Sequence, residues 1–170
     1  KNKFFNKNTT TILTNGDKVS KDEYEENLEE NLKNLVERMK RGGYRPKPSR
    51  RVFIPKDGSD KKRPLGISSY EDKLVEYVIA QILTEIYEPK FFNVNYGFRP
   101  NRNCHQAVRE VIEDVQYRKT NYVVEADIKG FFDNVSHEWM IKFLEHDIAD
   151  RIFLDIIEKF MKAGIMEKGK

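Results

Sequence analysis

The sequence predicts an α+β fold in which helices pack on a small antiparallel sheet and a β-hairpin. Two observations carry this prediction: the apolar residues of 20–41 recur at helical spacing, and two β-rich runs flank the turn residues of 57–59. A third apolar run, at 122–128, predicts a further strand. The order is helix, hairpin, two helices, strand, two helices, which lacks the regular alternation of a doubly wound sheet. A chain of 170 residues has room for one or two small domains.

The first predicted helix begins at the capping box of Ser20 with Glu23 and ends at Gly42-Gly43. Before it, residues 1–19 are polar and show no clear period, so we expect a tail or an extension there. After it, Pro46 and Pro48 force an extended connection.

The hairpin is predicted from a strand at 51–56, a turn at Asp57-Gly58-Ser59 and a second strand at 63–67. The remaining elements are predicted by periodicity and by Pro or Gly stops. They are helices at 70–88 and 102–118 with a loop at 93–100 between them, the strand at 122–128, and helices near 136–145 and 148–163.

Composition excludes several classes of protein. Hydrophobic residues make up 38% of the chain and charged residues 35%, and no apolar run reaches the length of about 20 residues that spans a bilayer. The single cysteine, Cys104, excludes an internal disulfide, and its neighbour His105 does not complete a zinc pattern. We therefore expect no membrane partner and a reducing, cytoplasmic location.

Positive charge is concentrated in one stretch. Between Arg38 and Arg63 there are eleven Lys or Arg residues against two Asp residues, a net charge of +9, whereas the whole chain carries +3 and the remainder therefore carries −6. Such an excess is typical of a nucleic-acid-binding surface, although a solvated surface is the alternative. The apolar and aromatic residues inside it, such as Tyr44 and Phe53, favour a folded basic surface over a disordered tail.

A possible metal ligand ends the third apolar run. Residues 122–128 bring Asp127 to the end of the predicted strand, and Phe131 and Phe132 follow. A carboxylate in this position can bind Mg²⁺, which takes oxygen ligands from one or two carboxylates and from substrate phosphates. The alternative is that Asp127 only ends the strand and caps the next turn. Asp133 is expected to cap the turn or the helix that follows it.

Six short motifs occur in order, and together they carry a family resemblance. They are Gly43-Tyr44-Arg45-Pro46, Arg50-Arg51-Val52-Phe53-Ile54-Pro55-Lys56, Arg63-Pro64-Leu65-Gly66-Ile67, Tyr87-Glu88-Pro89-Lys90-Phe91, Tyr96-Gly97-Phe98-Arg99-Pro100 and Asp127-Ile128-Lys129-Gly130-Phe131-Phe132-Asp133. The chain thereby resembles the N-terminal fingers and upper palm of a bacterial group II intron reverse transcriptase, or maturase. Two departures are Ser68, where the family usually has proline, and Thr14-Asn15-Gly16-Asp17, which replaces a Gly-Val-Asp-Gly element.

The resemblance implies a role for each motif residue. Asp127 would be catalytic and would bind Mg²⁺ together with the Ile128 backbone carbonyl. Lys56 and Arg63 would contact the dNTP triphosphate, and the alternative is that they are solvated strand ends. Phe132 would exclude a ribose 2′-hydroxyl, and the alternative is that Phe131 and Phe132 both lie in the core. Two apolar residues would pack on the templating base: Leu65 and Ile67, for which half-buried packing in the sheet is the alternative. RNA contacts are assigned to six basic residues: Arg45, Arg50, Arg51, Lys61, Lys62 and Arg99, the last of which could instead brace the fingers against the palm.

The resemblance also implies a domain plan: a tail at 1–19, fingers at 20–118 and the start of an incomplete palm at 119–170. The family's second carboxylate pair would be an Asp-Asp dipeptide, and this sequence has none, so we expect polymerase activity of the parent protein and none of the fragment. The implied partners are group II intron RNA, an RNA template with a DNA primer, and dNTP, with a homodimer as a further possibility. A non-catalytic RNA-binding maturase module and a dimerisation module stay open as alternatives.

Overall fold

The structure, a computed structural model, describes residues 19–56 and 58–167, so the predicted tail and the segment Thr14–Asp17 lie outside the described residues apart from Val19. The chain forms two compact units. The first contains the described residues up to Ile79 together with those from His137 onward, and the second is Ala80–Ser136. Each unit is described here by itself, and the predicted division into fingers and palm stays a prediction. No helix of the described ranges is long and apolar enough to cross a membrane.

The described part of the first unit has two helices at 21–40, where one was predicted. Helix α1 spans Lys21–Glu25 and α2 spans Leu28–Lys40. The capping box is confirmed: the Glu23 amide donates to Ser20 Oγ at 3.2 Å, and the Ser20 amide donates to Glu23 Oε2 at 2.7 Å. The break falls at Asn27, whose φ of −125° and ψ of 40° are not helical. Asparagine accepts such a conformation more readily than most residues, which explains why apolar spacing alone did not reveal the break.

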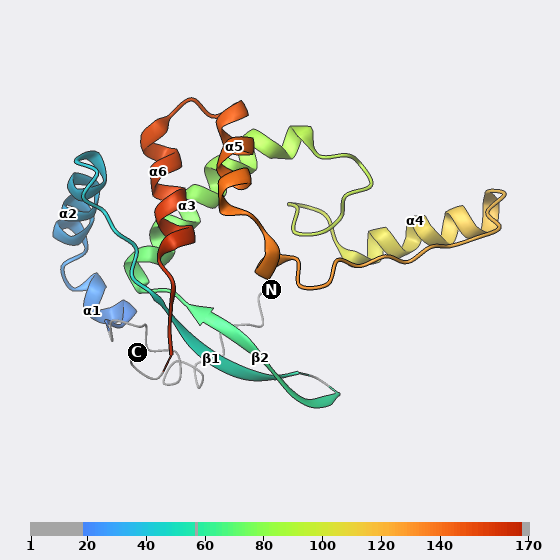
Figure 1. Ribbon diagram of the computed structural model, residues 1–170, viewed down its shortest axis with the longest axis horizontal. Coiled ribbons are helices and arrows are strands. Elements are labelled where there is room, and N and C mark those ends of the chain that lie inside the picture. Colours follow the sequence, from blue (N-terminus) through green and yellow to red (C-terminus); the bar gives the residue numbers. More distant parts are fainter. Residues whose placement is uncertain (1–18, 57, 168–170) are drawn as a thin grey trace. The chain divides into compact units, whose positions relative to one another are not determined.

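Within the described residues the sheet has three strands, in the order β2-β1-β3. Strands β1 (Ser49–Lys56) and β2 (Ser59–Ile67) form the predicted antiparallel hairpin, which is longer than the sequence indicated (Figure 1). Strand β3 (Ile165–Met166) pairs parallel with β1, so the sheet is mixed and not purely antiparallel as predicted. A strand of two residues leaves no periodic signal, which is why it was missed. The α+β class is confirmed.

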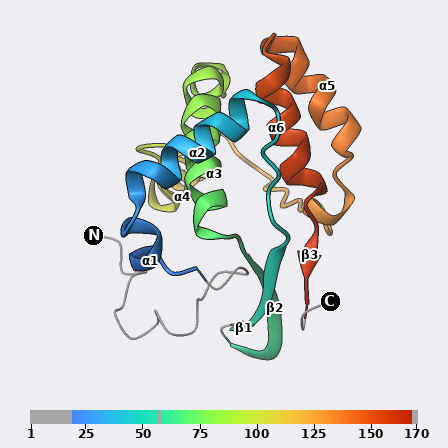
Figure 2. The same ribbon diagram turned by 90° about the vertical axis from the view of Figure 1, so that its left-hand side faces the viewer.

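The core of the first unit lies between helices. Its buried cluster consists of Leu35 on α2, Tyr44, Val75 on α3 and Ile156 on α6, with Met39, Ile79 and Phe160 packed against it. Helix α3 spans Tyr70–Tyr87, α5 His137–Asp147 and α6 Arg151–Lys162, close to the predicted ranges (Figure 2). Helix α6 begins at Asp150, whose carboxylate accepts hydrogen bonds from the amides of Ile152 and Phe153.

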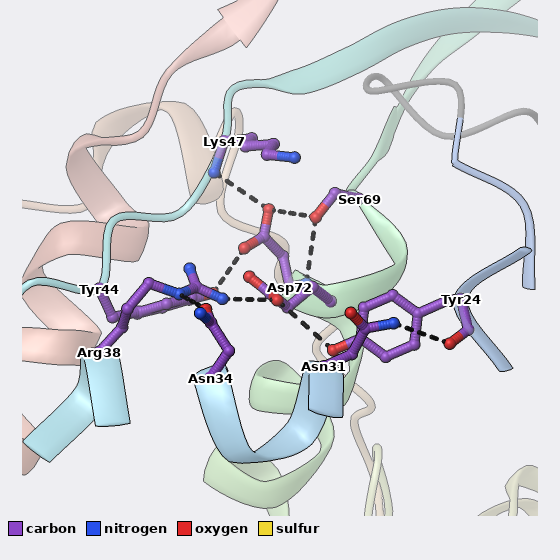
Figure 3. A network of polar contacts seen from close by, with 9 residues as sticks. Tyr24, Asn31, Asn34, Arg38, Tyr44, Lys47, Ser69 and Asp72 are labelled. Atoms are coloured by element: carbon purple, nitrogen blue, oxygen red, sulfur yellow. Dashed lines mark hydrogen bonds and ion pairs between the residues drawn. The ribbon is translucent and has the colours of Figure 1, made fainter. Parts of the chain in front are cut away.

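A polar network borders this core at the first turn of α3 (Figure 3). Asp72 is buried, and its carboxylate accepts hydrogen bonds from the Tyr44 hydroxyl (2.5 Å), the Ser69 hydroxyl (2.7 Å) and the Lys47 amide (3.0 Å). Burial of the ring, and then its hydrogen bond to Asp72, raise the pKa of the Tyr44 phenol well above its ordinary value. Tyr44 therefore stays protonated in the folded protein over the usual pH range.

The second unit contains the end of α3, the 3₁₀ turn Glu88–Lys90 (η2), α4 at Cys104–Tyr117 and the 3₁₀ turn Phe132–Asn134 (η3). The predicted strand at 122–128 is wrong: these residues have no regular secondary structure, and their side chains are exposed. A strand is stable only when a neighbour satisfies its backbone groups, and none of the three described strands pairs with this segment.

Two leucines of α2 provide a test of the core. Leu35 is 5% exposed and Leu32 is 38% exposed. We expect Leu35→Ala to lower the free energy of unfolding by about 2–4 kcal/mol, because it removes buried methyl groups and leaves a cavity. Leu32→Ala, the matched control on the same helix, should cost about 1 kcal/mol or less. Urea denaturation followed by circular dichroism measures both, and equal losses would contradict the proposed core.

The raised pKa of Tyr44 predicts a pH dependence. Above pH 10 the phenol ionises in the unfolded chain but not in the folded one, so stability that is complete below pH 10 is lost as the pH rises. Tyr44→Phe should be the less stable protein at pH 8, because Asp72 loses a donor. Its deficit should shrink by about 1–2 kcal/mol between pH 8 and pH 11. Urea titrations at both pH values test this, and a Tyr44→Phe deficit that is the same at pH 8 and pH 11 would contradict it.

Candidate nucleic-acid and metal-binding segments

The two faces of the hairpin are determined by its register. Arg63 lies opposite Ile54, Leu65 opposite Val52, and Ile67 opposite Arg50. Because directly opposed residues share a face and successive residues alternate, these six side chains lie on one face, which we call the Arg63 face. The other face, the Lys62 face, carries Arg51, Phe53, Pro55, Lys62, Pro64 and the backbone of Gly66.

The predicted contacts therefore divide between the two faces. Arg63, Leu65 and Ile67, predicted to bind the triphosphate and the templating base, lie together on the Arg63 face, whereas Arg51 and Lys62 lie on the opposite face. Ile67 is only 5% exposed, which favours packing in the sheet over contact with a template. Leu65 is 43% exposed and keeps the open apolar surface that such a contact needs.

The basic residues of this unit differ in how they are held. Lys61, Lys62 and Arg63 are exposed on β2. Arg51 forms an ion pair with Glu167 at 3.3 Å, and the Arg45 guanidinium donates to the carbonyls of Gly42 and Tyr44. Lys56 ends the ladder of β1, where its backbone pairs with Ser59. Strand β2 thus carries three exposed cations in succession, at 61–63.

The metal-ligand candidate in the second unit precedes a tight turn. Asp127 and Ile128 are exposed, and Gly130 follows with a φ of +62°, a conformation that favours glycine. The Asn134 side-chain amide donates to the Gly130 carbonyl at 2.7 Å, and the Asn134 backbone amide donates to the Phe131 carbonyl at 3.1 Å. A Cβ atom at Gly130 would come within 3.1 Å of Asn134 Nδ2, so a side chain there would crowd that amide in addition to straining the backbone.

The aromatic pair after Asp127 is formed locally. The ring centroids of Phe131 and Phe132 are 5.4 Å apart in an edge-on arrangement, and Phe132 is 88% exposed. Exposure of that ring fits the role of a steric gate better than a role in the core. Asp133 lies inside the 3₁₀ turn at 132–134.

The donor set at Asp127 suits a hard cation. A carboxylate oxygen and a backbone carbonyl are the ligands that Mg²⁺ prefers. Within the described ranges, no group of three or more His, Cys, Asp or Glu side chains is assembled that could hold a metal ion. If Asp127 and Ile128 bind a cation, they contribute two oxygen atoms, and further ligands have to come from elsewhere.

Arg99 is held tightly inside its own loop. Its guanidinium donates to the Glu88 carboxylate, with a shortest distance of 2.9 Å, and to the carbonyls of Phe92 and Asn95 at 2.8 and 2.9 Å. It also lies over the Phe91 ring, and its side chain is 8% exposed. Nearly all its N–H groups are thus engaged, which favours bracing of the 88–99 loop and makes Arg99 the weakest of the six predicted RNA contacts.

Sequence reasoning missed the residues that anchor the hairpin, although a signal was present. The pattern Ser-x-x-Asp at Ser69 and Asp72, just before an apolar helical run, is a signature of a helix N-cap. In the structure the Asp72 amide donates to Ser69 Oγ at 3.1 Å. The burial of Asp72 and its bonds to Tyr44 and Lys47 join residues 25 and more positions apart, and no local pattern contains that information.

Comparison with known proteins agrees with the motifs. Residues 54–170 match the family model described as "Reverse transcriptase (RNA-dependent DNA polymerase)". The chain is 42% identical over 139 residues to the group II intron-encoded protein LtrA of Lactococcus lactis subsp. cremoris, which is 82% of this chain and 23% of LtrA. It is 35% identical over 156 residues to protein YkfC of Escherichia coli K12, which is 90% of this chain and 41% of YkfC.

A plant relative extends the comparison. Nuclear intron maturase 1, mitochondrial, of Arabidopsis thaliana is 27% identical over 93 residues, covering 55% of this chain and 13% of that protein. The chain thus spans less than half the length of these curated relatives. Since the family model covers more than half of the chain and the motifs occur in the expected order, the chain belongs to the reverse transcriptase (RNA-dependent DNA polymerase) family and is of the group II intron type.

Proposed function

We propose that this chain forms the fingers and the start of the palm of an RNA-directed DNA polymerase encoded by a group II intron. One observation carries the proposal: an exposed cation and an exposed apolar side chain, Arg63 and Leu65, lie two residues apart on the same face of a hairpin. A nucleotide bound to a template presents both a triphosphate and the flat face of a base, and these two side chains match those chemistries. Lys56 would add a second cation near the hairpin tip.

The metal chemistry of the parent polymerase would depend on Asp127. Its carboxylate and the Ile128 carbonyl would hold Mg²⁺, which, when bound, neutralises phosphate charge and helps align the attacking and leaving oxygens. The chain's own contribution is to present these oxygens just before the Gly130 turn. Phe132, whose ring is exposed, would lie against the sugar of the incoming nucleotide and exclude a 2′-hydroxyl by its bulk.

Partners of the parent protein follow from the same proposal. The basic hairpin would bind group II intron RNA as well as the RNA template and DNA primer, and would thereby support splicing and mobility of the intron. The fragment alone would bind RNA without polymerising, because its sequence lacks an Asp-Asp pair. A bacterial cytoplasmic location and a homodimer belong to this proposal as further expectations.

A second candidate function is RNA binding without chemistry. It is favoured by the fact that the basic hairpin lies in the first unit and Asp127 in the second, so the RNA-binding surface does not depend on the carboxylate. The two candidates differ in what Asp127 does, whereas a dimerisation module would differ from both in its weak response to salt.

RNA binding by the chain should depend on salt in proportion to the phosphates contacted. We expect the logarithm of the binding constant for structured RNA to fall with the logarithm of the salt concentration. The slope should be several units, since each neutralised phosphate contributes about −0.7 to −0.9. Replacing Arg50, Arg51, Lys61 and Lys62 with alanine should flatten that slope and weaken binding. Fluorescence anisotropy between about 50 and 300 mM salt measures the slope, because over this range the Debye length falls from about 14 Å to about 6 Å.

A charge-matched control separates the effect of the hairpin cations from the effect of the chain's net charge. Replacing Lys21, Lys33, Lys142 and Lys162 with alanine removes the same charge from exposed positions of the helices in the same unit. The slope of this control should stay close to that of the unmodified chain. If both quadruple variants lose the same slope, the hairpin is not the binding surface.

The carboxylate and the gate are tested in the full-length protein. Asp127→Asn keeps the shape of the side chain but removes its charge, so DNA synthesis should fall by about 10³-fold or more while RNA binding is retained. Asp133→Asn, six residues on, is the matched control and should stay active.

Phe132→Ala should keep dNTP incorporation and admit ribonucleotides. Primer extension with each nucleotide type gives the answer; an active Asp127→Asn protein would remove Asp127 from the metal site, and unchanged discrimination would remove Phe132 from the sugar gate.

A further inference from the structure

The network at the first turn of α3 touches both ends of the β-hairpin. Lys47, two residues before β1, donates its backbone amide to Asp72 Oδ2, and Ser69, two residues after β2, donates its hydroxyl to the same oxygen (Figure 3). The hairpin therefore enters and leaves the core at one carboxylate oxygen. The other oxygen, Oδ1, accepts from Tyr44 in the buried cluster.

Because Asp72 is buried, loss of any hydrogen bond to its carboxylate is costly. Asp72 is 2% exposed, so water cannot replace a donor that is lost. A charge-assisted hydrogen bond is about twice as strong as a neutral one, and a buried carboxylate left short of donors is destabilised. The two connections, residues 47–48 and 68–69, are consequently held at fixed points, and the direction in which the hairpin leaves the helices follows from them.

The neighbouring acid has different partners. Glu71 accepts hydrogen bonds from the Arg38 guanidinium at 2.6 Å and from the Tyr24 hydroxyl at 3.4 Å. Those partners lie on α2 and α1 and not on the hairpin. Adjacent carboxylates of one helical turn thus serve two purposes, which gives a natural control.

We propose that Asp72 is a positioning residue for nucleotide and template: by holding both ends of the hairpin, it directs the Arg63 face toward the substrate. This inference rests on the proposed function, since it takes Arg63 and Leu65 as the groups that meet the substrate. Asp72 itself touches neither substrate nor metal. Loss of its second oxygen acceptor leaves the basic side chains intact but lets the hairpin change direction.

Asp72→Asn is a sharp test of this role. The amide keeps one oxygen acceptor but replaces the other with an NH₂ group, which accepts no hydrogen bond, so the side chain can no longer accept from Tyr44 on one side and from Lys47 and Ser69 on the other. In the full-length protein we expect the KM for dNTP to rise about tenfold, while kcat per active molecule changes less than about threefold. Ser69→Ala should act in the same direction, and Ser69→Thr, which restores a hydroxyl, should recover the KM.

Glu71→Gln separates positioning from stability. It removes the charge partner of Arg38 and should lower the melting temperature, but it should leave the KM for dNTP within about twofold of the unmodified protein. If Glu71→Gln raises the KM as much as Asp72→Asn does, or if Asp72→Asn and Ser69→Ala both leave it unchanged, the positioning role is overturned. Should Asp72→Asn fail to fold, the Ser69→Ala and Ser69→Thr pair decides the question alone.

Hydrogen exchange of the chain gives a readout that does not need polymerase activity. Asp72→Asn and Ser69→Ala should speed amide exchange in β1 and β2 about tenfold relative to α6, and Glu71→Gln should not. If the full-length protein makes no DNA but the hairpin amides respond in this way, the polymerase proposal fails and the anchoring of the hairpin stands. If exchange in β1 and β2 is unchanged, the positioning proposal fails whatever the enzyme does.

Discussion

A single buried carboxylate constrains the first unit more than any other group. Moving an ionised side chain out of water costs several kcal/mol unless donors replace the lost water, so Asp72 is stable in the core only while Tyr44, Lys47 and Ser69 donate to it. These donors come from the core, from the entry of the hairpin and from its exit. Formation of the helical core and orientation of the hairpin are therefore coupled, because neither can be completed without satisfying the same two oxygens.

The charges of β2 serve the fold as well as the proposed function. β2 is an edge of the sheet, and an exposed edge can pair with another chain. Lysines, arginine and proline on that edge, at 61–64, oppose such pairing by repulsion and by the missing amide of Pro64. The same cations are the exposed ones that face phosphate in the proposed function. One set of residues thus meets two requirements, which makes an exposed basic hairpin a stable arrangement for a nucleic-acid-binding protein.

The parts of the structure that sequence predicted are those with local signals. Helix periodicity, the capping box at Ser20 and the β-rich runs of the hairpin depend on neighbours within a few residues, and the elements they predicted are present in the part of the chain that the structure describes. The predicted turn at 57–59 includes Asp57, which lies outside the described residues. Two of the parts that failed depend on distant partners: the pairing of β3 with β1, and the strand at 122–128. The third, the helix break at Asn27, is local. The same distinction holds for the candidate site, since the motif residues were identified from the chain, whereas the burial of Ile67, the engagement of Arg99 and the role of Asp72 needed three-dimensional contacts.

The backbone on the two sides of Asp127 also differs in whether local interactions hold it. The turn that follows it needs only nearby groups: glycine at 130 accepts the left-handed backbone, and Asn134 closes the turn onto the Gly130 carbonyl. The segment before it, rich in valine and exposed, has side chains suited to a sheet but no strand beside it among the described residues. Exposed valines and an unpaired backbone are less stable in water than they would be beside a neighbouring strand. Among the described residues, the direction of the Asp127 carboxylate is therefore constrained by the turn that follows it and not by a strand pairing before it.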